Sequence, residues 1–202
     1  MLSQTLILIA VTCAVSLVGF GNPKMIESLL LWPPAITRKG EYHRLLTYGL
    51  VHGDFQHLLF NMITLFFFGR AMEPFFGGIL GSNGFAFFYV LGLVVSILPT
   101  YYRHRNDASY RSLGASGAVS GVLFAFILLQ PWATIYVYVI PVPAIVYAGL
   151  YTAYTIYMDR RGGDNVNHSA HLWGAAYGVA FPVAVAPGVV PYFFQALLRP
   201  GG

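Results

Sequence analysis

Charged side chains are too sparse in this sequence for water to be the solvent of most of the chain. Only 9% of the 202 residues are charged and 57% are hydrophobic, whereas about 25% of the residues in a soluble domain are charged. The apolar residues also gather into stretches long enough to cross a bilayer. The sequence therefore predicts an all-α membrane protein, because a helix satisfies its own backbone hydrogen bonds in lipid.

Six apolar stretches predict a six-helix bundle in a single domain over residues 1–202. The predicted transmembrane helices cover residues 2–20, 55–76, 85–102, 115–130, 132–158 and 168–185. Pro141 and Pro143 should kink the fifth helix or delay its start. We interpret the first stretch as a retained helix rather than a signal peptide, since no basic residue precedes it and no clear cleavage site follows.

The first loop, residues 21–52, mixes apolar residues with charges and prolines. It is too polar to span a membrane cleanly and too apolar to lie free in water. This composition predicts short helices that are partly embedded in the membrane.

The basic residues indicate a lipid partner rather than a nucleic acid. The net charge is +4, but the basic residues are scattered through short loops and form no continuous stripe. They fit attraction to the anionic head groups of a lipid bilayer. Cys13 is the single cysteine, so an intrachain disulfide is excluded.

Three polar sets lie in the predicted helices, where polar groups are costly and are therefore functional candidates. The first set is Ser116 within the sequence Gly-Ala-Ser-Gly, followed by Gly121. A serine at the junction of a polar loop and an apolar helix meets water and is held by a rigid element. Gly117 and Gly121 share one helical face. Taken alone, this pattern is better explained as a packing motif between helices.

The second set is His171 with Gly174 and Gly178, which share a helical face at spacings of three and seven. The glycines allow this helix to lie tightly against another. If that partner carries Ser116, the imidazole can take the proton of the hydroxyl and activate it as a nucleophile. The histidine alone is equally well explained as a structural hydrogen-bonding group.

The third set is His57 and Asn61, four residues apart and hence on one side of the second predicted helix. Their N–H groups are suitable donors for the oxyanion that forms during acyl transfer. Taken alone, they are better explained as hydrogen bonds between membrane helices. Together, however, the three sets supply a nucleophile, a base and oxyanion donors, each near one end of a predicted span.

These motifs make the chain similar to the rhomboid intramembrane proteases. The matching pieces are His-Leu-Leu-Phe-Asn from His57, Gly-Ala-Ser-Gly around Ser116, and Ala-His at His171 with the following glycines. They occur in the family's order, on its second, fourth and sixth helices. The resemblance extends from the first predicted helix to the sixth.

The resemblance implies a serine endopeptidase with a Ser–His dyad and no acidic third member. Ser116 would attack the scissile carbonyl, His171 would act as base and then as acid, and His57, Asn61 and the Ser116 backbone N–H would hold the oxyanion. The substrates would be transmembrane proteins, with no metal or cofactor, and the location would be the bacterial inner (plasma) membrane. Arg44 and Glu73 match positions that brace the first loop in family members.

The sequence departs from the family at the residue one turn after the nucleophile. An aromatic ring often occupies that position and stacks on the histidine, but here the residue is Ser120. Another group must therefore orient His171. We also predict that His52, Gly53 and Asp54 line the water entry to the site and that the fifth helix is a lateral gate.

The loop charges disagree with the family's membrane orientation. Nine of the eleven Lys and Arg residues lie in the loops after the first, third and fifth predicted helices. The positive-inside rule places those loops in the cytoplasm, whereas the bacterial family pattern places them outside. We follow the family pattern, because Arg44 and other basic residues belong to the long first loop.

Three rival hypotheses are less consistent with the sequence. A non-catalytic rhomboid relative that binds membrane clients would not need the intact serine, histidine and donor set. A transporter would be expected to show two related halves with broken helices. A metalloprotease would need an HExxH motif and a third ligand, whereas His168 and His171 form only an HxxH pair. His168 also competes with His171 for the role of base, although it lacks the glycine pattern.

Overall fold

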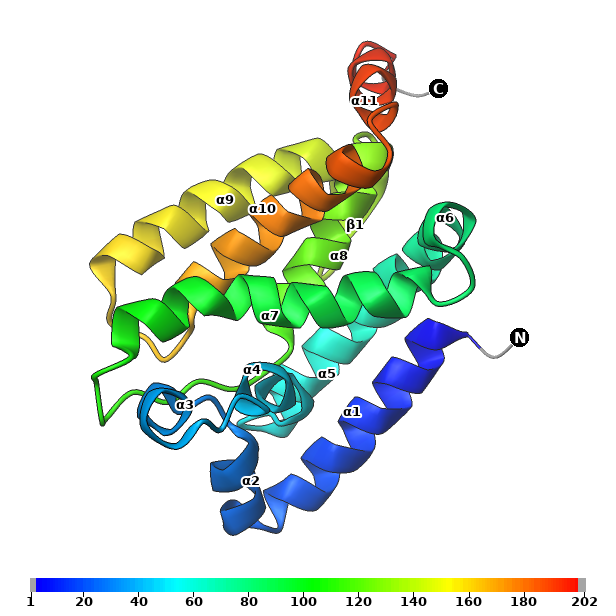
Figure 1. Ribbon diagram of the computed structural model, residues 1–202. Coiled ribbons are helices and arrows are strands. Elements are labelled where there is room, and N and C mark those ends of the chain that lie inside the picture. Colours follow the sequence, from blue (N-terminus) through cyan, green and yellow to red (C-terminus); the bar gives the residue numbers. More distant parts are fainter. Residues whose placement is uncertain (1–2, 200–202) are drawn as a thin grey trace.

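The computed structural model describes residues 3–199, which form a mostly helical bundle with one small β-hairpin (Figure 1). The six longest helical segments are α1 (Gln4–Phe20), the continuous run of α5, η2 and α6 from Phe55 to Leu80, α7 (Gly84–His104), α8 (Ser116–Leu129), α9 (Ala144–Arg161) and α10 (His168–Val185). Helix α11 (Val189–Leu197) follows and is bent by 118° from α10.

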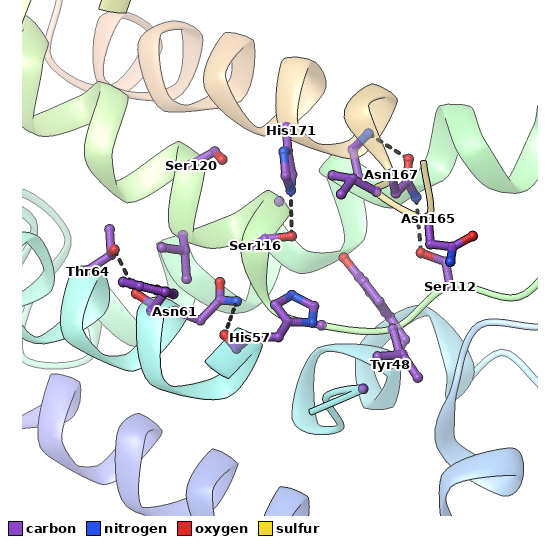
Figure 2. Close-up of a pocket in the computed structure, with 18 of the residues that line it drawn as sticks. Tyr48, His57, Asn61, Thr64, Ser112, Ser116, Ser120, Asn165, Asn167 and His171 are labelled. Atoms are coloured by element: carbon purple, nitrogen blue, oxygen red, sulfur yellow. Dashed lines mark hydrogen bonds between the residues drawn. The ribbon is translucent and has the colours of Figure 1, made fainter. Parts of the chain in front are cut away.

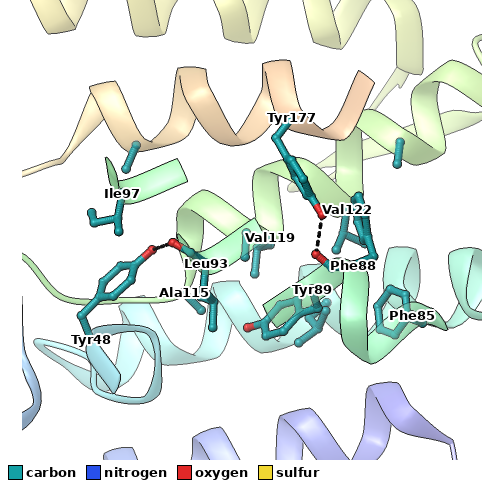
Figure 3. Close-up of a cluster of buried hydrophobic side chains, with 14 of the residues drawn as sticks. Tyr48, Phe85, Phe88, Tyr89, Leu93, Ile97, Ala115, Val119, Val122 and Tyr177 are labelled. Atoms are coloured by element: carbon teal, nitrogen blue, oxygen red, sulfur yellow. Dashed lines mark hydrogen bonds between the residues drawn. The ribbon is translucent and has the colours of Figure 1, made fainter. Parts of the chain in front are cut away.

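Helix α8 lies at the centre of the bundle. It is apolar all round, and 11 of its 14 residues are buried, as expected for a helix enclosed by others. Its largest contact is with α10, and it also packs against α7 and α9. The buried cluster around it includes Ala115, Val119 and Val122 together with Phe88 and Ile97 of α7 (Figure 3).

Glycines allow α8 and α10 to approach to backbone contact. A methyl group placed on Gly174 would overlap the Gly117 carbonyl, and one on Gly178 would overlap the Gly121 carbonyl. This close approach brings the first turns of both helices together, which decides how near Ser116 and His171 lie.

The first loop folds into short helices, as predicted: α2 (Pro23–Leu29), α3 (Pro33–Lys39), α4 (Arg44–Thr47) and the 3-10 turn η1 (Tyr48–Leu50). Arg44 is buried and braces this loop. It donates to the Glu41 carboxylate at 2.6 Å and to the carbonyls of Glu27 and Leu30, both at 2.8 Å. Glu73 also has a structural role, but it does not brace the first loop as the matching family position does. Its carboxylate instead accepts bonds at the start of α1, including 2.7 Å from the Gln4 N–H.

The second helical segment is longer than predicted. It contains a π-helical turn, η2 (Leu65–Gly69), and continues as α6 (Arg70–Leu80), four residues beyond the predicted end at residue 76. The chain leaves the helix only at Gly81, whose φ of 84° favours glycine.

The predicted fifth helix, residues 132–158, was wrong over residues 132–143. Residues Thr134–Val137 (β1) and Ile140–Pro143 (β2) form an antiparallel hairpin, and α9 begins only at Ala144. Pro141 and Pro143 lack the N–H that a helix interior requires, and both are tolerated in a strand whose outer edge is unpaired. The prolines therefore delay the start of the helix, the second of the two effects expected of them.

By length and composition, two described helical segments are suited to cross a membrane: Phe55–Leu80 and Gly84–His104. A third is added if the bent pair α10 and α11 counts as one span. Helices α1 and α8 are apolar but have only 17 and 14 residues. The structure thus gives a membrane-type helical bundle, while the count of six spans stays a prediction.

Candidate active site

Ser116 is the first residue of α8, directly after a turn that only glycine fits. Gly114 has a φ of 110°, and the His57 ring fills the space that a side chain there would need. The Gly114 N–H donates to the Tyr48 carbonyl at 2.9 Å. The turn therefore fixes the path of the chain into α8, and it leaves the Ser116 N–H at the N-terminus of the helix, where donors have no acceptor within the helix.

His52 holds the same turn from the other side. This buried side chain accepts a hydrogen bond from the Ala115 N–H at Nε2, at 3.3 Å. Nδ1 therefore carries the proton and donates to Ser16 of α1 at 3.0 Å. Our prediction that His52 lines the water entry was wrong, since the ring faces α1 and the turn. Gly53 and Asp54 do line the cavity described below.

The hydroxyl of Ser116 and the imidazole of His171 are in direct contact. The distance between Ser116 Oγ and His171 Nε2 is 2.7 Å. His171 lies in the first turn of α10 and points at Ser116, with His57 and Asn61 on the opposite side of the serine (Figure 2). Within residues 3–199, no acidic side chain bonds to His171.

Asp54 caps α5 (Phe55–Thr64) by accepting the His57 N–H at 2.8 Å, which fixes the first turn of this helix. Asn61, one turn later, donates from Nδ2 to the His57 carbonyl at 2.9 Å. The side chains of His57 and Asn61 line the same cavity as Ser116. The structure thus brings together all four side chains that the sequence singled out.

A cavity of about 710 Å³ connects these residues with three surrounding segments. On one side it is lined by α5, including Phe60 and Thr64, and on the other by Tyr147 and Tyr151 of α9. The loop before α10 also lines it, at Asn165. The cavity is thus large enough for several side chains of a bound peptide, and it lies between α5 and α9.

His168 lies one turn before His171 but does not take its place beside Ser116. It is buried and donates from Nε2 to Asp164 at 3.1 Å. This hydrogen bond holds the pKa of the Asp164 carboxyl below its ordinary value. His171, and not His168, is therefore the histidine that contacts Ser116.

Tyr151 is a site residue that the sequence analysis missed. Its ring stacks on His171, with ring centroids 6.3 Å apart and planes inclined by 26°. Its hydroxyl is 2.7 Å from Ser120 Oγ. The absence of an aromatic residue at position 120 signalled that another group must orient His171, but no spacing in the sequence links residue 151 to it.

Comparison with known proteins is consistent with this arrangement. The family model for the Rhomboid domain matches residues 39–188, which is most of the chain. The chain therefore belongs to the rhomboid family, a family of membrane proteins.

Three relatives show how far the similarity extends. "RHOMBOID-like protein 12, mitochondrial" of Arabidopsis thaliana is 33% identical over 69% of this chain and 45% of its own length. "Putative rhomboid protease YdcA" of Bacillus subtilis is 32% identical over 51% of this chain and 52% of its own. "Rhomboid protein 1, mitochondrial" of Saccharomyces cerevisiae is 32% identical over 64% and 38%. The chain thus spans about half or less of these relatives' lengths. Two of the three names are mitochondrial, so the comparisons do not support the bacterial inner membrane in particular.

Proposed function

We propose that this chain is an intramembrane serine endopeptidase that cleaves transmembrane proteins, with Ser116 as nucleophile and His171 as general base. The observation that carries the proposal is the 2.7 Å contact between Ser116 Oγ and His171 Nε2. This contact lies in a cavity of about 710 Å³ within an apolar bundle. A serine hydroxyl is a weak nucleophile until a neighbouring base accepts its proton.

The first half of the reaction forms an acyl-enzyme. His171 Nε2 takes the hydroxyl proton while Ser116 Oγ bonds to the scissile carbonyl carbon, and the carbonyl oxygen becomes an oxyanion. The protonated His171 then gives its proton to the leaving amine as the C–N bond breaks. In the second half, a water molecule from the cavity gives a proton to His171 as its oxygen bonds to the acyl carbon. The bond between that carbon and Ser116 Oγ then breaks, and His171 returns the proton to Ser116 Oγ.

The oxyanion needs donors that are in place before the reaction begins. The Ser116 N–H is available because it opens α8. The Asn61 amide has two hydrogens, and one of them is bound to the His57 carbonyl, which leaves the other for the oxyanion. His57 supplies a ring N–H from the same helix. Three donors from two helices would therefore surround the reacting carbonyl.

The substrate would enter sideways from the lipid, between α5 and α9. The cavity is bounded by these two helices, and α9 packs against α10 and α8 rather than closely against α5. An engineered disulfide between α5 and α9 should abolish cleavage of a transmembrane substrate and leave labelling by a small probe intact. Cleavage that continues in the locked protein would contradict this route.

A fluorophosphonate probe tests the proposal on the purified protein in mild detergent. Wild type should be labelled, whereas Ser116→Ala and His171→Ala should not. His168→Ala is the matched control: it removes the neighbouring histidine of the same helix and should retain labelling. A folded wild type that neither labels nor cuts a model transmembrane substrate would instead indicate a non-catalytic, client-binding relative.

A further inference from the structure

The face of the His171 ring is covered by a side chain from a different helix. Tyr151 of α9 stacks on it at 6.3 Å between centroids and 26° between planes, which is the offset geometry favoured by aromatic pairs. Tyr147 and Phe124 flank Tyr151, at 5.7 and 5.6 Å between centroids. The ring of Tyr151 is therefore itself held in place from two sides.

His171 has little else to fix its orientation. Its Nε2 contacts Ser116, but within residues 3–199 no side chain or carbonyl bonds to its Nδ1. The ring torsion of histidine has broad minima, so one hydrogen bond leaves the imidazole free to rock about it. A ring packed on its face restricts that motion, because rocking would drive the two rings together or apart.

Helix α8 holds both partners of this arrangement. Ser116 and Ser120 are four residues apart and share one face of the helix. Ser116 contacts His171 at 2.7 Å, and Ser120 contacts the Tyr151 hydroxyl at 2.7 Å. Two serines of one helix thus hold two stacked rings, one from α10 and one from α9.

We propose that Tyr151 is the positioning residue for His171 and that Ser120 fixes Tyr151 in turn. The inference rests on the proposed function, since it concerns the orientation of the proposed base. It has a consequence for α9: any displacement of this helix away from α8 withdraws the ring from His171. The orientation of His171 toward Ser116 would therefore depend on the position of α9, the helix that bounds the cavity.

Labelling rates measure this coupling without any substrate-docking step. The second-order rate constant for a fluorophosphonate probe is determined for purified wild type, Tyr151→Phe, Tyr151→Leu and Ser120→Ala. Loss of the ring in Tyr151→Leu should slow labelling about threefold to tenfold. Tyr151→Phe keeps the ring and should lose less than about threefold, as should Ser120→Ala, since each removes a single neutral hydrogen bond.

An exchange of the two residues separates positioning from a general structural role. The double variant Ser120→Tyr with Tyr151→Ser keeps the composition of the contact and supplies the ring from α8. It should recover most of the labelling lost in Tyr151→Leu. Tyr157→Leu is the matched control: the same change on the same helix, at an exposed residue that bonds only Arg161 among the described side chains, should label like wild type.

Thermal unfolding of each variant shows that it is folded. If Tyr151→Leu labels as fast as wild type, or a folded exchange variant labels no faster than Tyr151→Leu, the positioning role is excluded while the proposed function stands. If wild type itself is not labelled and Ser116→Ala is indistinguishable from it, the proposed function fails first.

Discussion

At the scale of single residues, the Asn61 side-chain amide donates only one of its two hydrogens. One hydrogen bonds to the His57 carbonyl at 2.9 Å, and no other acceptor within residues 3–199 takes the second. The bond to its own helix holds the amide still, so the second hydrogen would be in place as the proposed oxyanion donor before a substrate arrives. Such preorganisation is what makes an oxyanion donor effective.

Replacement of Asn61 by alanine should therefore act on the chemical step. We expect kcat for a model transmembrane substrate to fall on the order of 100-fold, as for the loss of one oxyanion donor in other hydrolases. The thermal midpoint of the variant, measured in the same detergent, serves as the control for folding. A kcat equal to that of wild type would exclude Asn61 from the oxyanion site.

Asp164 gives the protein a dependence on pH outside the membrane. Its pKa is lowered by the hydrogen bond from His168, so the folded state binds a proton at this carboxyl less readily than the unfolded state does. The stabilisation is fully present above the ordinary value of 3.8 and is lost as pH falls below it, through the lower pKa of the folded state.

The matching measurement is the thermal midpoint between pH 7 and pH 3 for wild type and Asp164→Asn. Wild type should have the higher midpoint at neutral pH, and the difference should shrink as the pH falls below about 4. Asp159→Asn is a control that leaves the contact with His168 intact. A constant difference across this range would show that ionisation of Asp164 does not contribute.

The sequence alone predicted the polar side chains of the candidate site, but not the residue that packs against His171. Ser116, His171, His57 and Asn61 carry unusual chemistry for apolar helices, so they could be singled out one by one. Tyr151 is one of 14 tyrosines, and nothing in its surroundings along the chain marks it. Its proposed role rests on the packing of α9 against α8 and α10, which no local pattern in a single sequence predicts.

At the scale of elements, the contact between α8 and α10 has no room for additional atoms. Gly178 lies directly against the Gly121 carbonyl, so a methyl group there forces the two helices apart. Gly149 of α9 is also a helical glycine, but a methyl group on it meets no atom within 4 Å. The two helical glycines therefore allow the same substitution to be compared at a crowded and at an open position.

We expect opposite effects from alanine at these two glycines. Gly178→Ala should destabilise the protein by about 1–3 kcal/mol through overpacking and should slow labelling of Ser116 by separating it from His171. Gly149→Ala should be neutral or stabilise by up to about 1 kcal/mol, since alanine is the better helix former. Thermal unfolding and probe labelling of both variants test this, and equal effects would contradict it.

The hairpin shows why the fifth segment was misjudged. Residues 134–143 form an apolar run, and hydrophobicity alone does not separate a short strand from a buried helix. The β-branched and aromatic side chains of β1 favour a strand, and the prolines of β2 exclude a regular helix. Those local preferences, rather than the apolar content, decided the structure.

At the scale of the whole molecule, the number of spans fixes the relation between the two chain ends. Six spans, the predicted number, would place both termini on the same side of the membrane, and the bacterial family pattern that we follow would make that side the cytoplasm. The basic loops would then face outward. Because Arg44 is bound to carbonyls and a carboxylate inside the first loop, its charge is a poor guide to orientation.

Reporter fusions to each end of the full chain in a bacterial host test both points. A reporter that is active only in the cytoplasm should be active at both termini, and one that needs the extracytoplasmic side should be silent at both. Fusion within the loop between α7 and α8, at residues 105–112, is the internal control and should give the reverse pattern. Termini on opposite sides would mean an odd number of spans.

The shortness of α8 has a consequence for where the proposed hydrolysis would take place. Its 14 residues extend for about 21 Å at 1.5 Å per residue, whereas the hydrocarbon core of a bilayer is about 30 Å thick. With its C-terminal end at one surface, the helix starts about 9 Å below the other. Ser116 would thus be recessed by only a few water diameters, and a peptide bond would have to lie at that depth to be cut. The length of α8 would therefore determine the depth in the membrane at which the substrate is cut.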